Sequence, residues 1–336
     1  MSYGLRLAGV NVLAGVDCDE ECRQTYETNV NGSVFIKASV ETLKPTQLAS
    51  QTGIKVGDDA LAFVGCTPCQ FWSKIRTSKD KAAKTAFLLE SFARFVHHFR
   101  PGFVVVENVP GLSSNKSRSP LPAFIDELRR HGYACAEGVV NANHYGVPQC
   151  RMRYLLVASR LSPTIKLPPS AAAAGPVVRS VIGTAHGFKP LSAGQCDHDD
   201  PLHAAAQLSE CNLMRIRRTP HSGGTRASWR DDPALQIAAY KGRDHIFRDV
   251  YGRMSWDRPA PTITTRFNSL SNGRFGHPEE DRAISLREGA ILQTFPRSFA
   301  FHGPNVSVIA RQIGNAVPPE LARHVGEHIR RVAKHA

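Results

Sequence analysis

The sequence predicts an α/β protein in which a doubly wound, mostly parallel sheet is followed by a smaller, irregular domain. Apolar runs of strand length alternate with segments of helical spacing through residues 1–158. A stretch rich in Pro and Ala then marks a linker at residues 163–176. Beyond it, to about Tyr251, the chain is rich in Arg, His, Gly and Ser and shows weak periodicity.

Each expected element follows from its local pattern. The expected strands are the apolar runs at residues 11–16, 60–64, 103–106 and 154–157. The expected helices repeat apolar residues at helical spacing; one ends at residues 5–8, and the others span residues 85–99, 284–293 and 320–333. Strands that alternate with helices favour parallel pairing in a doubly wound sheet.

Composition limits the function classes. With 336 residues, 42% of them hydrophobic, the chain can bury a sizeable core. Its formal net charge of +13 favours a polyanionic partner, although a merely basic surface is the alternative. No apolar run approaches about 18 residues, so we expect no membrane association. The first residues lack a cleavage site, and eight Cys in this length indicate reduced cytoplasmic thiols rather than a disulfide scaffold.

Cys69 is a candidate nucleophile. It lies just beyond the expected strand at residues 60–64, where open α/β sheets place ligands and catalytic groups. The spacing from Cys66 leaves a redox dithiol, a zinc pair or a buried structural thiol as alternatives. A redox pair normally opens a helix, and Cys18 and Cys22 have the wrong spacing for a second zinc pair.

Three charged residues form two further patterns. Glu107 ends an apolar strand, and a carboxylate there is costly to desolvate unless it has a partner or a role. A cap on the following turn is the alternative.

Arg151 and Arg153 lie two apart on an expected strand and should face the same side. Two guanidiniums on one side favour a carboxylate, base or phosphate ligand, and an exposed basic strand is the alternative.

Five motifs, in order along the chain, resemble the motif set of C5 cytosine-specific DNA methyltransferases. They are Thr67-Pro-Cys-Gln70, Glu107-Asn-Val109, Gln149-Cys-Arg-Met-Arg153, residues 282–296 and Gln312-Ile-Gly-Asn-Ala-Val-Pro318. The likeness covers most of the chain outside residues 160–250. It implies a Rossmann-like S-adenosylmethionine-dependent methyltransferase sheet at residues 1–158 and a target-recognition domain at 159–300. Residues 301–336 would return to the catalytic domain.

The resemblance also implies a reaction. A methyl group passes from S-adenosyl-L-methionine to carbon 5 of cytosine in a specific DNA sequence. Cys69 would add to carbon 6 and make carbon 5 nucleophilic, and Glu107 would supply a proton or hydrogen bond at N3. Arg153 would hold the base edge, and Arg151 would support the surroundings of Cys69. The target base must leave the double helix to reach this pocket.

The same resemblance assigns contacts. The expected cofactor-binding residues are Asp17 at the ribose, Cys18 on the adenine, Ser39, Pro68, Leu88, Asn315 and Val317; Ser39 stands where the family often has Asp. The expected DNA-binding residues are Gln70, Ser73, Lys74, Arg76, Arg215, Arg217, Arg218 and Arg226. Residues 70–85 resemble the mobile loop that closes over the flipped base. For the arginines of the middle region, a solvated basic loop is the alternative.

The family begins with a strand and a Gly-rich cofactor loop, and residues 1–9 resemble the helix after that loop. We therefore expect an N-terminally truncated member that binds S-adenosylmethionine weakly. The expected protein is a monomer of the bacterial cytoplasm that acts on double-stranded DNA, either alone or beside a separately acting restriction endonuclease. A catalytically impaired DNA-binding remnant and a tRNA cytosine-5 methyltransferase are the alternatives.

No metal site is expected. Cys196, His198, His203 and Cys211 do not fit the spacings of zinc fingers or ribbons. His97 and His98 lie at the end of an expected helix, where we interpret them as complementing the negative end of the helix dipole.

Overall fold

The computed structural model describes residues 1–66, 88–114, 119–171, 174–240 and 246–335. The chain forms two compact units. The first comprises Met1–Ala142, Met152–Ala171 and Leu321–Ala336, and the second comprises Asn143–Arg151 and Ala172–Glu320. These units differ from the predicted boundaries, because residues 143–151 and 301–320 fall in the second unit and residues 159–171 in the first.

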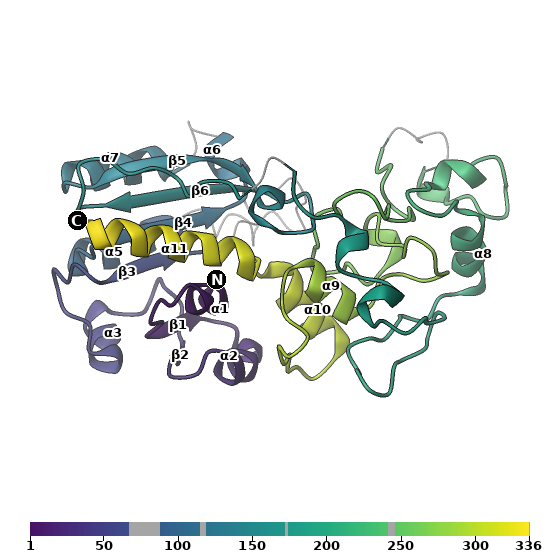
Figure 1. Cartoon of the computed structure of the whole chain (residues 1–336), viewed down its shortest axis with the longest axis horizontal. Coiled ribbons are helices and arrows are strands. Elements are labelled where there is room, and N and C mark those ends of the chain that lie inside the picture. The colour runs from purple at the N-terminus through teal and green to yellow at the C-terminus, as the bar shows by residue number, and fades with distance from the viewer. Residues whose placement is uncertain (67–87, 115–118, 172–173, 241–245, 336) are drawn as a thin grey trace. The chain divides into compact units, whose positions relative to one another are not determined.

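The first unit is built on two sheets (Figure 1). Its strands are β1 (Ala14–Asp17), β2 (Val34–Lys37), β3 (Ala62–Gly65), β4 (Phe103–Asn108), β5 (Ala134–Asn141) and β6 (Met152–Ser159). β1 and β2 form a parallel pair, and the larger sheet has the order β3-β4-β6-β5. β3 and β4 are parallel, whereas β6 is antiparallel to both of its neighbours.

The expected α/β class is confirmed, and β6 is the strand that departs from the expected parallel sheet, because it runs opposite to β3, β4 and β5. Only a short connection separates β5 from β6, too short for the crossover helix that parallel strands require. β5 also escaped prediction. It lies at the sheet edge and is only partly buried along its length, so its sequence forms no continuous apolar run.

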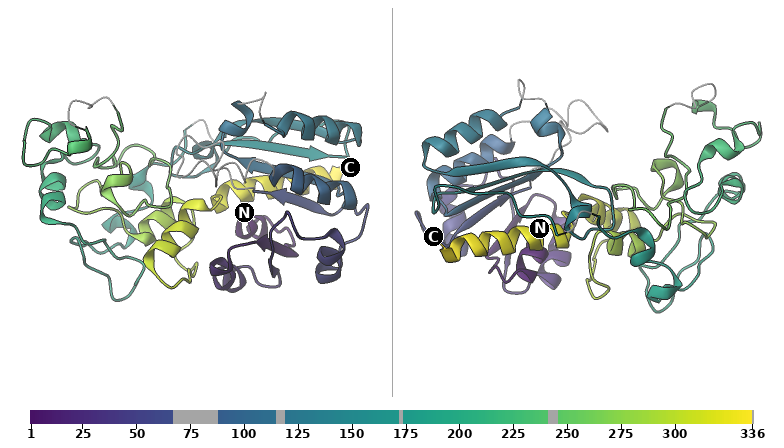
Figure 2. Two further views of the ribbon diagram at one scale, coloured as in Figure 1. Left: turned by 180° about the vertical axis from the view of Figure 1, so that it is seen from behind. Right: turned by 45° about the horizontal axis from the view of Figure 1, so that its top comes forward.

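Helices cover both faces of the larger sheet. The helices of this unit are α1 (Ser2–Leu7), α2 (Arg23–Asn29), α3 (Pro45–Thr52), α5 (Leu88–Phe99), α6 (Gly111–Ser114), α7 (Leu121–Arg130) and α11 (Pro319–His335). α5 and α7 pack on one face through Phe92, Val96 and Phe124, and α11 packs on the other through Val325 and Ile329 (Figures 1 and 2). This three-layer arrangement is the doubly wound architecture expected from the sequence.

Packing, rather than hydrogen bonding, joins the two sheets. Within the described ranges, β1 pairs only with β2, and β3 pairs only with β4. Ala14 of β1 and Ile36 of β2 share an apolar cluster with Phe63 of β3.

The second unit is largely irregular and has no multi-residue strand among its described residues. Its longer helices are α8 (Glu210–Arg218), α9 (Leu286–Leu292) and α10 (Val306–Asn315). A side-chain cap marks the start of each of these helices, and on α8 the Ser209 hydroxyl accepts a hydrogen bond from the Asn212 N–H. Ser285 and Glu288 form a reciprocal capping box on α9, and the Asn305 side chain accepts a hydrogen bond from the Val308 N–H on α10.

A buried ion pair stabilises this irregular unit. The Arg282 guanidinium donates to both carboxylate oxygens of Glu288, at 2.7 and 2.9 Å, and both side chains are fully buried. Burial alone would raise the pKa of Glu288, but the charge and hydrogen bonds of Arg282 outweigh it and hold that pKa at about 2. The pair therefore remains ionised near neutral pH. Among the described helices, none is both long and apolar enough to cross a membrane.

Candidate active site

Glu107 and Arg153, two of the residues expected at the catalytic centre, lie at one end of the larger sheet. Gly65 of β3 pairs in parallel register with Val106 of β4, so Cys66 and Glu107 follow at the same level. Cys66 is exposed. Pro68, Cys69 and the expected DNA contacts Gln70, Ser73, Lys74 and Arg76 lie outside the described residues.

The structure brings Glu107 and Arg153 together as an ion pair. Every residue of β4 is buried, and Glu107 is the charged one among them. Its Oε1 lies 3.0 Å from Nε of Arg153, with the two side chains only 8% and 13% exposed. A buried carboxylate of this kind requires a partner, and the guanidinium supplies the opposite charge. The pair presents a carboxyl group and a cation at one end of the sheet.

Arg151 takes a different place from the one expected. β6 begins at Met152, so the alternation that would put Arg151 on the same side as Arg153 does not extend to it. The buried Arg151 guanidinium donates instead to the carbonyl oxygens of Ile263, Gly314 and Ala316, at 3.0, 3.3 and 3.0 Å. It thereby fixes the backbone on both sides of Asn315, an expected cofactor contact.

Two buried glutamines support the same part of the second unit, and the sequence did not single them out. The Gln149 amide donates to the Leu292 carbonyl and to Oε1 of Gln293, at 3.0 and 2.7 Å. The Gln293 amide donates in turn to the Ile313 carbonyl at 2.6 Å. Both residues lie within the motifs that carry the family resemblance, which was the available signal.

Gly314 is required by a close backbone approach in this segment. A Cβ at Gly314 would lie 2.4 Å from the carbonyl carbon and oxygen of Thr264, well inside van der Waals contact. The neighbouring Asn315 is exposed, whereas Val317 is buried. The segment is therefore held tightly while one polar side chain remains accessible.

The expected adenosine-binding residues lie at the carboxyl ends of β1 and β2. Asp17 ends β1, and its backbone carbonyl accepts a hydrogen bond from the Ala38 N–H, which follows β2. The Asp17 side chain is exposed, with Oδ1 accepting from the Asp19 N–H at 2.9 Å. Partial burial and the nearby Asp17 charge raise the pKa of the Cys18 thiol, which keeps it neutral.

Ser39 brings a second carboxylate to this edge. Its hydroxyl lies 3.2 Å from Oε2 of Glu41 and accepts a hydrogen bond from the Glu41 N–H at 3.3 Å. Glu41 is exposed and was not identified from the sequence. The signal that could have indicated it is the Ser two residues earlier, a pattern that is typical of a turn. Leu88, the remaining described residue of the expected cofactor set in this unit, is buried at the start of α5.

Of the four arginines in residues 159–300 that are expected to contact DNA, two have internal partners. The Arg215 guanidinium lies 5.7 Å from the Trp229 ring and 5.5 Å from the Tyr251 ring. It also donates to the backbone carbonyls of Leu235 and Gln236. Arg226 is buried, stacks on Tyr240 at 4.3 Å and donates to the Ile246 carbonyl at 2.6 Å.

The other two arginines face solvent. Arg217 is 61% exposed, and its Nε lies 3.7 Å from a carboxylate oxygen of Asp281. Arg218 is also exposed. Both extend from the last turn of α8. DNA contact by these residues remains a prediction, for which Arg217 and Arg218 are the accessible members.

The Cys and His residues of the second unit do not form a metal site in the part of the chain that the structure describes. His203 is buried, with its two ring nitrogens 2.9 Å from the Ser285 hydroxyl and 2.8 Å from the Lys189 carbonyl. Cys196, His198 and Cys211 lie on or near the surface.

Comparison with known proteins gives one consistent result. A family model described as C-5 cytosine-specific DNA methylase matches residues 1–331. The type II methylase M.HgiDII of Herpetosiphon aurantiacus is 38% identical over 335 residues, covering 98% of this chain and 92% of that protein. The type II methyltransferase M1.BsuMI of Bacillus subtilis is 31% identical, covering 96% of this chain and 75% of the relative.

Solved structures share the fold. A protein described as a DNA modification methyltransferase encoded within a prophage (E. coli) aligns with a TM-score of 0.74 at 20% identity, covering 99% of this chain and 96% of that one. The Dnmt2 methyltransferase of S. pombe aligns with a TM-score of 0.60 at 16% identity, covering 96% and 92% of the two chains.

Proposed function

The chain belongs to the C-5 cytosine-specific DNA methylase family, and on that premise we propose how its residues methylate carbon 5 of cytosine in a specific DNA sequence. The observation that supports the proposal most is the buried pair of Glu107 and Arg153, at the end of the strand beside the one that leads to Cys69. At that edge of the sheet, a cation can hold the cytosine ring and a carboxyl group can protonate it.

The nucleophile in this proposal is the Cys69 thiolate. Its sulfur bonds to carbon 6 of the cytosine, and the electron pair of the carbon 5–carbon 6 double bond moves toward N3. Glu107 delivers a proton or hydrogen bond to N3, which leaves carbon 5 with the character of an enamine. Arg153 holds both Glu107 and the base edge. After methylation, loss of the proton on carbon 5 restores the double bond and expels the Cys69 thiolate.

S-adenosylmethionine supplies the methyl group. The residues at the ends of β1 and β2 fit its adenosine portion: the exposed Asp17 carboxylate can accept hydrogen bonds from ribose hydroxyls, and the neutral Cys18 thiol can pack on adenine. We propose Ser39, Pro68 and Leu88 as further contacts from the first unit. Asn315 and Val317 of the second unit are proposed on the family resemblance alone, and Arg151 serves by fixing the backbone around Asn315.

The DNA partner is supported by charge as well as by family. A net charge of +13 suits phosphate contacts, and the target base must flip out of the duplex to meet Cys69. We propose Gln70, Ser73, Lys74 and Arg76 as contacts near the flipped base. Arg217 and Arg218 are proposed to contact DNA directly, whereas Arg215 and Arg226 position the loops of the recognition region, residues 159–300. We also propose that the chain acts as a monomer and that any restriction endonuclease acts separately.

A transfer assay with labelled S-adenosylmethionine tests this function. Incubated with duplex DNA and, separately, with tRNA, the chain should label DNA, and bisulfite sequencing should place the product on one cytosine of a fixed sequence. Label in tRNA alone would favour the tRNA methyltransferase, and DNA binding without transfer would indicate a non-catalytic remnant. Glu107→Gln should reduce transfer at least a hundredfold. The control, Glu137→Gln, alters an exposed carboxylate on β5 that accepts from the Tyr154 hydroxyl, and it should remain active.

A further inference from the structure

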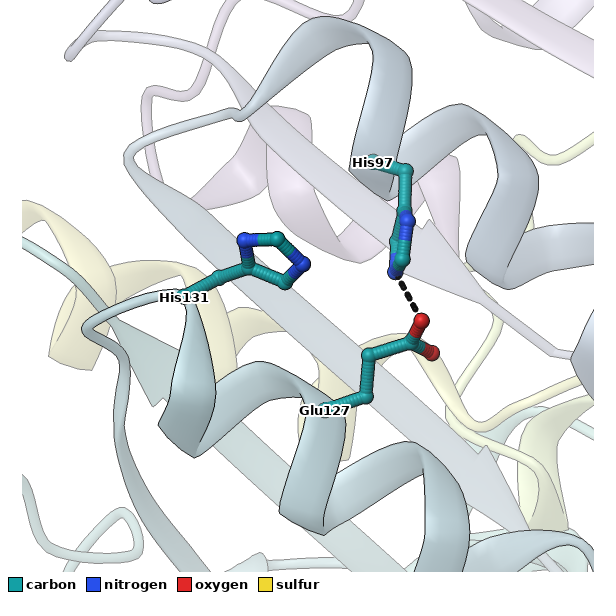
Figure 3. Close-up of side chains that lie close together, drawn as sticks. All are labelled: His97, Glu127 and His131. Atoms are coloured by element: carbon teal, nitrogen blue, oxygen red, sulfur yellow. Dashed lines mark ion pairs between the residues drawn. The ribbon is translucent and has the colours of Figure 1, made fainter.

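We propose that His97, Glu127 and His131 form a binding site for a divalent transition-metal ion of the zinc class. The three side chains converge on the outer surface of the first unit (Figure 3). Nε2 of His97 lies 2.6 Å from Oε1 of Glu127, and the rings of His97 and His131 lie 4.8 Å apart between centroids. One ligand atom from each residue lies within 4.8 Å of the others. Two imidazoles and a carboxylate are ligands that zinc prefers.

The two helices fix these ligands before any ion binds. Glu127 and His131 are four residues apart at the end of α7, so their side chains lie on one face of that helix. His97 lies in the last turn of α5. Val96, Phe124 and Leu128 pack α5 against α7 in the apolar core beneath the cluster. Metal ligation would therefore require little rearrangement of the backbone.

The geometry is within reach of a tetrahedral ion. Bonds of about 2.1 Å place the ligand atoms of such a site about 3.4 Å apart. The His97–Glu127 pair, at 2.6 Å, is closer than this, and all three ligand atoms lie within 4.8 Å of one another. The side chains of His97 and Glu127 are 38% and 29% exposed, so small rotations can equalise these distances. Three protein ligands leave a fourth position for water.

Electrostatics favour a cation here, on balance. Both α5 and α7 end at the cluster, and helix carboxyl ends carry partial negative charge. The Glu127 carboxylate adds a full negative charge. Arg100, which lines the same shallow hollow, opposes the ion, whereas Tyr133 donates its hydroxyl to the Pro101 carbonyl and is no ligand. A bound ion would tie α5 to α7 and stabilise the helical layer on one face of the sheet, without taking part in methyl transfer.

Cobalt(II) titration of the full chain, first stripped with a chelator, tests the site. Cobalt on nitrogen and oxygen ligands gives weak d–d absorption, whereas any of the eight cysteines would add a strong sulfur-to-cobalt charge-transfer band. We expect one ion, d–d bands without the charge-transfer band, and a higher melting temperature with cobalt or zinc. His131→Ala and Glu127→Gln should each weaken binding at least tenfold. His98→Ala, the exposed neighbour on the same helix, should bind as the parent does.

The variants separate a metal site from a simple ion pair. His131→Ala preserves the pair between His97 and Glu127, so a loss of binding in this variant shows that ligation needs the third residue. Glu127→Gln keeps the shape of the side chain and gives a second reading if His131→Ala folds poorly. A charge-transfer band, equal affinity in His131→Ala, or no binding at millimolar cobalt would each overturn the proposal.

Discussion

Removing Arg282 should destabilise the second unit strongly, because it would leave Glu288 charged and buried. Arg282→Met deletes both hydrogen bonds to the carboxylate while nearly preserving side-chain volume. The Ser285 N–H would still donate to Oε2 of Glu288, at 2.7 Å, so the carboxylate would keep one partner. The variant should retain the helix cap and lose the counter-ion.

Two arguments give a similar loss of unfolding free energy for Arg282→Met. Holding the pKa of Glu288 at about 2, against an ordinary value of 4.5, corresponds to about 3 kcal/mol of differential stabilisation. Breaking a buried ion pair by removing one partner typically costs about 3–5 kcal/mol. We therefore expect Arg282→Met to lower the free energy of unfolding of this unit by about 3 kcal/mol.

Urea denaturation followed by tryptophan fluorescence measures this loss, since Trp229 and Trp256 report on the second unit. The double variant Arg282→Met with Glu288→Leu should recover much of the stability, because it removes the uncompensated charge as well. A loss below about 1 kcal/mol in the single variant, or a double variant less stable than the single, would refute this reasoning.

Two further predictions concern pH and specificity. Because the pKa of Glu288 is depressed, the stability that this residue contributes is present above the ordinary Glu pKa of 4.5 and is lost as the pH falls toward about 2. The unfolding free energy of Glu288→Gln, measured in urea, should therefore depend less on pH over this range than that of the parent. Identical pH profiles for the two proteins would contradict the assignment. Replacing residues 160–255 with the matching region of a family relative should move methylation to the relative's site in bisulfite sequencing, and an unchanged site would place recognition elsewhere.

Local sequence patterns predicted the elements whose signals are local. The apolar spacing of α5 and the unbroken apolar run of β4 were sufficient, and Glu107 stood out as an acid at the end of that run. β2 and β5 were missed. β2 has only two buried residues, with an exposed residue on each side, and β5 is a partly exposed edge strand, so each depends on its neighbours for its conformation.

Side-chain partners were harder to predict, because they depend on contacts between distant segments. Arg151 was misplaced because the start of β6 is set by pairing with Asn141 across the sheet. The aromatic rings around Arg215 come from separate loops, so the sequence could not distinguish an internal cation from a DNA contact. His97 was interpreted as a helix-end charge because its partner Glu127 lies on another helix.

The most direct test of the central claim is covalent trapping on DNA that carries 5-fluorocytosine at the methylated position. Fluorine on carbon 5 cannot leave as a proton, so an enzyme bonded at carbon 6 should remain attached after methyl transfer and survive denaturation. With S-adenosylmethionine present, the parent chain and Cys66→Ser should form this complex, and Cys69→Ser should form none. A complex that survives Cys69→Ser but disappears with Cys66→Ser would show that the chemistry resides on the other thiol.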